Sequence, residues 1–277
     1  MRLAISNIAW DVSEDELIAE LLNRYAIDAI DIAPGKYFPA PAQATASEIL
    51  AVRHWWAVRG IEITGMQALL FGTTGLNVFG SEESQAALLR HLREVCRIAA
   101  GLGATRLVFG SPKNRDRSGL DDQSALEVAV GFFGRLGDIA QEHGVVICLE
   151  PNPTCYGANF MVTSAETRGV VERIAHPSIR MQLDTGAITI NEENPRRVIR
   201  ESAALIGHVH ASEPALAPLG DSTTDHAEIA EELRTVLPGH VVSIEMVATD
   251  KEDHATSIER ALIVACQCYR AETEATV

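Results

Sequence analysis

The sequence predicts a (β/α)8 barrel that forms one domain over residues 1–277. Short β-branched stretches alternate with longer amphipathic segments along the chain, and eight such strand–helix units fit its length. The main alternative is an open doubly wound sheet, which usually carries a glycine-rich turn after its first strand. The corresponding turn here, NIAWD, contains no glycine. We therefore expect the closed barrel.

Each expected strand is rich in β-branched or other apolar residues. In order, the strands are predicted at RLAIS (2–6), DAIDIA (28–33), IEITGMQ (61–67), RLVFG (106–110), VVICLE (145–150), IRMQLD (179–184), IGHVHA (206–211) and VVSIEM (241–246). Between them, apolar residues recur at helical spacing, and several segments begin on a Ser, Thr or Asp cap and end on Gly. Clear helices are predicted at SEDELIAELLNRY (13–25), ESQAALLRHLREVCRIAAGLG (83–103) and SALEVAVGFFGRLGDIAQEHG (124–144). Trp55 and Trp56 fall in the second expected helix, where we expect packing.

The composition is that of a globular protein, with 47% hydrophobic and 22% charged residues. A formal charge of −15 argues against nucleic acid or an anionic membrane as partner, because both would repel the acidic surface. The N-terminus lacks the long apolar segment of a signal peptide, and no stretch approaches about 18 uninterrupted apolar residues. We expect a cytoplasmic protein. The five cysteines form no CxxC pair, which predicts free thiols rather than a structural zinc site.

The predicted strands five to eight each end near a side chain that binds metal ions. Strand five, within VVICLEPNP, ends on Glu150, and the next three end near Asp184 in MQLDTG, His210 in GHVHAS and Glu245 in VSIEM. Taken singly, these residues also suit a salt bridge, a turn cap or a core histidine. In a (β/α)8 barrel, however, all four lie at the end of the strands where active sites form. Three carboxylates in so small an area would repel one another unless a cation neutralised them.

Three carboxylates and one imidazole favour Mn²⁺, Mg²⁺ or Co²⁺, whose remaining coordination positions can take water or substrate oxygens. Zinc is less favoured because no thiolate is present in the set. An ion that holds the carbonyl and neighbouring hydroxyl of a sugar would acidify the adjacent C–H bond. Glu150 and Glu245 could then act as proton acceptor and proton donor.

These residues and their contexts, CLEP, QLDTG, HVHASE and SIEM, resemble the sugar phosphate isomerase/epimerase family of xylose-isomerase-like barrels, which includes the ketose 3-epimerases. The resemblance spans the whole chain. It implies that Glu150, Asp184, His210 and Glu245 bind one ion, with Mn²⁺ favoured, and that the two glutamates move the substrate proton. Two expected substrate contacts differ: Ala187 stands where ketose 3-epimerases usually have His, and Leu216 where they tend to have Arg. These differences argue against a simple free ketohexose as substrate.

A basic loop is predicted to hold an anionic group of the substrate. The segment FGSPKNRDRSG (109–119) follows strand four and concentrates Lys113, Arg115 and Arg117 in an otherwise acidic protein. Because the loop emerges on the catalytic face, its cations could bind a phosphate or carboxylate. The alternative is a solvated loop without a ligand.

Further substrate contacts are predicted on the neighbouring loops. Asn152, Tyr156 and Asn159 in EPNPTCYGANF could donate hydrogen bonds to sugar hydroxyls. Gln67 follows strand three at the expected barrel mouth, and Glu213, beyond His210, is expected to contact substrate or orient a ligand.

The sequence thus predicts a metal-dependent isomerase or epimerase that acts on a sugar or sugar derivative, phosphorylated sugars included. An inosose-type dehydratase is the alternative enzyme, since it also abstracts a proton beside a carbonyl. A non-catalytic sugar-binding barrel would be expected to lose a ligand or a base, and neither is lost. An endonuclease of abasic DNA needs more histidines and a basic face. Barrels of this kind often form homo-oligomers, which one sequence does not settle.

Overall fold

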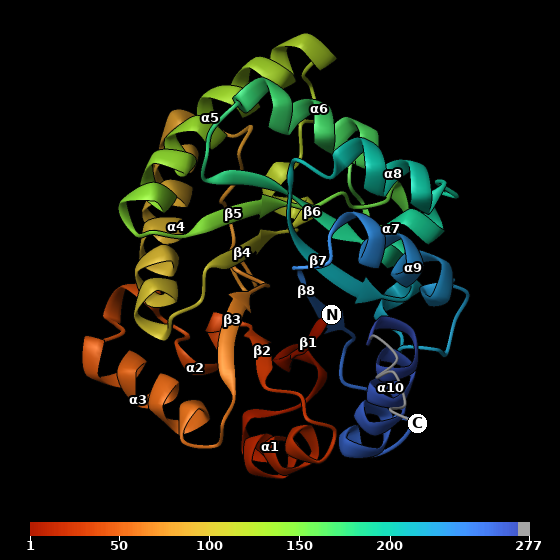
Figure 1. The fold of residues 1–277 in the computed structure, drawn as a ribbon. Helices are drawn as coiled ribbons and strands as arrows, with labels where there is room; N and C mark the ends of the chain where they lie inside the picture. Colours follow the sequence, from red (N-terminus) through yellow and green to blue (C-terminus); the bar gives the residue numbers. More distant parts are fainter. Residues whose placement is uncertain (271–277) are drawn as a thin grey trace.

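The computed structural model describes residues 1–270 and contains a closed barrel of parallel strands (Figure 1). Neighbours in sequence are neighbours in the barrel, and β1 pairs with both β2 and β8. The strands are β1 (Arg2–Ser6), β2 (Ala29–Ile32), β3 (Glu62–Met66), β4 (Arg106–Phe109), β5 (Val146–Leu149), β6 (Ile179–Asp184), β7 (Ile206–Ser212) and β8 (Val241–Glu245). The predicted (β/α)8 architecture is confirmed. The predicted domain limit at residue 277 lies outside the described residues.

Helices surround the barrel on its outer side (Figure 1). They are α1 (Asp15–Arg24), α2 (Pro34–Tyr37), α3 (Ala46–Ala57), α4 (Glu82–Leu102), α5 (Asp122–Glu142), α6 (Ser164–Ile174), α7 (Thr185–Ile190), α8 (Pro195–Ser202), α9 (His226–Val236) and α10 (His254–Tyr269). Side-chain caps begin several of them, as in α3, where Thr45 and Glu48 form a reciprocal capping box. The long helix α4 is followed by Gly103, whose φ of 85° lies in the left-handed region that glycine adopts without strain.

The apolar core fills the space between the barrel and its helices. Trp56 on α3 is fully buried, meets Trp10 edge to face at a centroid distance of 6.4 Å, and donates a hydrogen bond to the Tyr37 hydroxyl at 3.3 Å. This confirms the packing role predicted for Trp56.

All five cysteines lie in the described part of the chain and are free. Within residues 1–270, no helix is long and apolar enough to cross a membrane.

Because every strand pair is parallel, all eight carboxyl ends point to the same end of the barrel. The loops that follow the strands gather there. Short 3₁₀ turns shape the loops after β4, β5 and β7, at Pro112–Arg115, Thr154–Tyr156 and Pro214–Leu216. These three loops surround the candidate site.

Candidate metal centre

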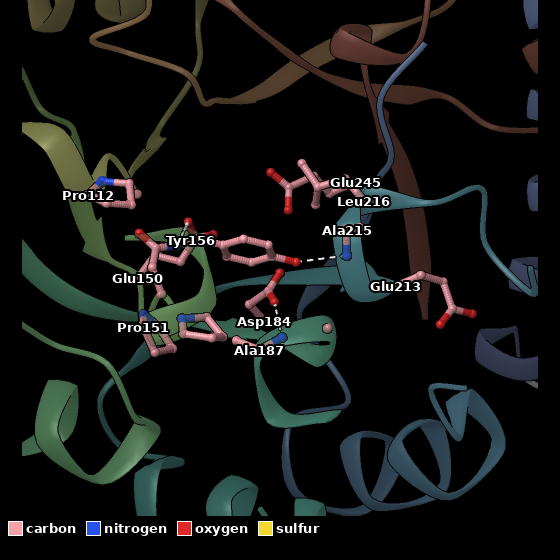
Figure 2. Close-up of a pocket in the computed structure, with 14 residues that line it drawn as sticks. Pro112, Glu150, Pro151, Tyr156, Asp184, Ala187, Glu213, Ala215, Leu216 and Glu245 are labelled. Carbon is pink, nitrogen blue, oxygen red and sulfur yellow. Dashed lines mark hydrogen bonds between the residues drawn. The ribbon is translucent and has the colours of Figure 1, made fainter. Parts of the chain in front are cut away.

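Four buried side chains at the ends of neighbouring strands meet in one place. Glu150 directly follows β5, Asp184 and Glu245 are the last residues of β6 and β8, and His210 lies within β7. One potential ligand atom from each lies within 4.8 Å of those of the others. Figure 2 shows the carboxylates of Glu150, Asp184 and Glu245 directed into the same cavity. This set could hold a metal ion.

Some buried polar atoms of this cluster lack hydrogen-bond partners, which tests whether the residues fit a cation. His210 Nδ1 lies 3.4 Å from Glu150 Oε1 and 3.3 Å from Glu245 Oε2, and it has no hydrogen-bond partner. Glu150 Oε1 is also buried without a partner. A buried polar group left unpaired is costly, and a divalent ion would satisfy the nitrogen and the carboxylate oxygens together. The donor set therefore fits such an ion.

Each carboxylate is held in place by a neighbouring polar side chain. Glu245 Oε1 accepts a hydrogen bond from Gln67 Nε2 at 2.7 Å, and Glu150 Oε2 accepts one from Asn152 Nδ2 at 3.2 Å. Asp184 Oδ2 accepts one from Ser212 Oγ at 2.6 Å. In addition, Asp184 Oδ1 caps α7 by accepting from the backbone N–H of Ala187 at 2.6 Å. Such partners fix the orientation of ligand groups.

The sequence patterns predicted neither a role for Ser212 nor the pairing of Asp31 with His208 beside the site. His208 Nε2 and Asp31 Oδ2 are 2.6 Å apart, and the same oxygen lies 4.0 Å from His210 Nε2, on the side of the ring away from the glutamates. The alternation of side chains along β7 could have indicated that His208 and Ser212 lie near the site. Both are two residues from His210 and therefore share its face of the strand.

The basic loop does not bring its cations into the cavity. Arg115 is fully buried and donates to the backbone oxygen of Glu150 at 2.7 Å and to Asn152 Oδ1. Burial lowers the pKa of Arg115 to about 10. Arg117 donates to the backbone oxygen of Asn159 at 2.7 Å and pairs with Asp122, while Lys113 is exposed. Arg115 thus stabilises the backbone at the end of β5. Asn159 stabilises the basic loop through its contacts with Arg117.

A cavity of about 430 Å³ lies above the four side chains. Asn152 and Tyr156 line it together with the apolar side chains of Pro151, Ala187 and Leu216. The Tyr156 hydroxyl accepts a hydrogen bond from the backbone N–H of Ala215 at 2.7 Å, which links the loops after β5 and β7 (Figure 2).

Glu213 is occupied with its own loop. Its carboxylate is directed away from the cavity (Figure 2) and accepts hydrogen bonds from the backbone N–H groups of Gly220 at 2.9 Å and Thr224 at 3.1 Å. His226 Nε2 lies 3.2 Å from the same carboxylate, and His226 Nδ1 lies 2.7 Å from the hydroxyl of the buried Tyr269. Glu213 therefore shapes the loop after β7 from within.

The crowded carboxylates change the protonation of the metal-free site. Burial and the carboxylates of Glu245 and Glu150 raise the pKa of Asp184 to about 8. Burial alone would lower the pKa of His210, but the same two glutamates raise it well above its ordinary value. At neutral pH, both Asp184 and His210 therefore hold protons when no cation is bound.

Metal binding at pH 7 is therefore expected to release protons, because a ligand must be deprotonated. Since both pKa values are raised, the affinity for Mg²⁺ or Mn²⁺ should increase as the pH rises towards about 8, where Asp184 loses its proton. Titration calorimetry in two buffers with different ionisation enthalpies measures the number of protons released. Identical heats in both buffers would contradict this prediction.

Comparisons with known proteins agree with the fold. The sequence profile of the xylose isomerase-like TIM barrel family matches residues 19–265. The structure of D-psicose 3-epimerase from Clostridium cellulolyticum, solved with D-tagatose, is similar, with a TM-score of 0.82, 17% identity, and coverage of 98% of this chain and 100% of that one.

Two further solved structures are similar at lower scores. A probable 3-DHS dehydratase from Bacillus anthracis has a TM-score of 0.74 and 14% identity, and the match covers 95% of this chain and 98% of that one. The IolI protein, solved with a zinc atom, has a TM-score of 0.74 and 16% identity, with coverage of 97% and 98%. A comparison with curated protein sequences gives no match. The profile covers most of the chain, and the chain belongs to the xylose isomerase-like TIM barrel family.

Proposed function

We propose that the protein is a divalent-metal-dependent isomerase or epimerase that moves a proton beside a carbonyl group of a sugar or sugar derivative. The observation that carries this proposal is the meeting of Glu150, Asp184, His210 and Glu245, with unpaired atoms that face one another. D-psicose 3-epimerase, which has the same fold, supports a sugar as ligand.

The four side chains would hold the ion. Three carboxylates and one imidazole favour Mn²⁺, with Mg²⁺ and Co²⁺ as alternatives, because oxygen donors predominate. A divalent ion in this site supplies Lewis-acid stabilisation for the negative charge that develops on the substrate oxygens when the C–H bond breaks.

Glu150 and Glu245 would transfer the proton. Asn152 and Gln67 each hold one oxygen of these carboxylates, and the other oxygen of each lies beside His210, where the ion would bind. One glutamate would remove the proton from the carbon beside the carbonyl, and the other would deliver a proton to the planar intermediate. Their positions after β5 and at the end of β8 bring them to the substrate from different strands.

We assign direct substrate contacts to Asn152 and Tyr156, which line the cavity. Glu213 also lines it, but its carboxylate is held by the backbone of its own loop. The other predicted contacts would act through the scaffold. Gln67 would orient Glu245, Arg115 would support the end of β5, and Glu213 and Asn159 would shape their loops, while Lys113 is exposed and does not line the cavity.

A dehydratase is the second candidate. The observation that favours it is the likeness to a probable 3-DHS dehydratase, together with the shared first step, in which a base removes a proton beside a carbonyl. In a dehydratase, the second acidic group would protonate a leaving hydroxyl instead of carbon.

Deuterium incorporation is expected to test this proposal. The protein would be incubated in D₂O with Mg²⁺, which avoids paramagnetic broadening of NMR spectra, and with ketoses, aldoses, keto-glycosides and their phosphates. We expect one substrate to gain deuterium at a carbon beside its carbonyl. Inverted configuration at that carbon indicates epimerisation, a shifted carbonyl indicates isomerisation, and loss of water indicates the dehydratase. Turnover of a substrate without solvent exchange would rule out proton transfer by exchangeable carboxylates.

A further inference from the structure

The cleft above the metal centre continues into a second cavity, which we call the apolar lobe. The lobe has a volume of about 520 Å³ and lies over the ends of β1 to β4. It shares Gly110, Pro112, Glu150, Leu216 and Glu245 with the first cavity. The two cavities therefore meet at the proposed proton-transferring glutamates, and a molecule bound at the metal centre can extend into the lobe.

The walls of the apolar lobe are made mainly of hydrocarbon. Leu69 and Leu70, on the loop after β3, are buried in it, and Val108 of β4 forms its base. Phe71 and Val247 stand at its rim, 88% and 42% exposed. Covering exposed apolar groups at a cavity rim with a hydrophobic ligand stabilises the complex, because apolar surface is removed from water.

Among residues 1–270, no basic side chain that lines this cleft is free of hydrogen bonds. Lys36 is the one basic residue that lines either cavity in this part of the chain. Its ammonium group already donates to the backbone oxygens of Asn7 at 2.7 Å and of Trp10, and it lies in the field of Asp11, Glu14 and Asp15. An anion placed beside Lys36 would face those three carboxylates. Gly110 and Pro112 of the basic loop line both cavities, but the cations of that loop, Lys113, Arg115 and Arg117, line neither.

We propose that the substrate is an uncharged sugar derivative with an apolar substituent. Its carbonyl and hydroxyl groups would face the metal centre, and the substituent would occupy the apolar lobe. This inference rests on the proposed function, and it deepens it by excluding phosphorylated sugars. The apolar side chains of Ala187 and Leu216 also line the first cavity and fit a substrate with few polar groups at these points.

Binding of hydroxamates tests the lobe independently of turnover, because a hydroxamate chelates a metal ion whatever reaction the site performs. Three probes would be titrated into the Mn²⁺-loaded protein by calorimetry: acetohydroxamate, 4-phenylbutanohydroxamate and phosphonoacetohydroxamate. Each buried methylene contributes about fourfold to affinity, so the phenyl probe should bind at least about tenfold more tightly than acetohydroxamate. The phosphono probe should bind no more tightly than acetohydroxamate.

Two exposed positions provide the variant and its matched control. Phe71→Asp at the rim of the lobe should remove most of the preference for the phenyl probe and leave acetohydroxamate binding within about twofold of the parent. Leu50→Asp, on α3 at a position that is 55% exposed and lines neither cavity, should leave both affinities within the same range.

The outcomes separate this inference from the proposed function. If no hydroxamate binds the metal-treated protein, the proposed metal centre is wrong. If all three bind and the phenyl probe gains nothing, or the phosphono probe binds most tightly, the uncharged apolar substrate is wrong while the metal centre stands. A dimer that dissociates on Phe71→Asp in sedimentation experiments, with no gain for the phenyl probe, would show that a second copy covers the lobe and would also overturn the inference.

Discussion

Replacing Glu150 or Glu245 by Gln is expected to reduce turnover of the substrate by about a thousandfold or more. General acid–base catalysis accelerates a reaction by about 10²-fold to 10⁴-fold, and each variant would lose one of the two groups that carry the proton. Glutamine preserves the shape of the side chain and one oxygen donor. It cannot accept a proton from carbon. Turnover measured with the substrate found in D₂O, in protein whose metal content equals that of the parent, checks this result.

Deuterium exchange in the two variants separates their roles. If one glutamate serves each face of the planar intermediate, Glu150→Gln and Glu245→Gln should each retain exchange from one epimer only. Glu172→Gln, an exposed position on α6, is the matched control and should leave turnover within about twofold of the parent. Undiminished turnover in both site variants would refute the two-glutamate mechanism and leave the barrel and the metal centre intact.

The barrel and its four strand-end residues were predictable because they depend on short-range patterns. Strand periodicity predicts where β5 to β8 end. A closed parallel barrel brings those ends together, and this does not depend on the conformation of the loops. Glu150, Asp184, His210 and Glu245 needed only these two steps, and the structure brings all four within reach of one ion.

The environment of Arg115 was not predictable from its place in a basic loop. The 3₁₀ turn Pro112–Arg115 directs its guanidinium inwards, under the backbone of Glu150, whereas sequence gives only the loop to which it belongs. Glu213 is similar. Its partners Gly220 and Thr224 depend on a loop with positive φ values at Ala215 and Leu216, which non-glycine residues rarely adopt.

The apolar lobe is also a product of loop conformation. The run ALLFG after β3 has the apolar character of a strand end, but the chain leaves the barrel at Met66 and the leucines line a cavity instead. Apolar periodicity does not distinguish a residue that packs in the core from one that lines a ligand pocket, because both exclude water.

Asp184→Asn and His210→Ala are each expected to weaken metal binding by about a hundredfold or more, since each removes one of four ligands. Asparagine still caps a helix, so α7 should keep its N-terminus and the variant should fold. Ser212→Ala removes only the hydrogen bond to Asp184 Oδ2 and is the matched control, with an expected loss of about tenfold.

Thermal unfolding with and without added Mn²⁺ measures this loss in the intact protein. A ligand at a hundred times its dissociation constant stabilises the folded state by about 2.7 kcal/mol, so the parent should gain several degrees in Tm. We expect that gain to disappear in Asp184→Asn and His210→Ala at the same Mn²⁺ concentration and to be reduced in Ser212→Ala. Both ligand variants would show circular dichroism spectra like that of the parent. If they retained the full Mn²⁺-dependent gain in Tm, the ion would be bound elsewhere, and these residues would not form the metal centre.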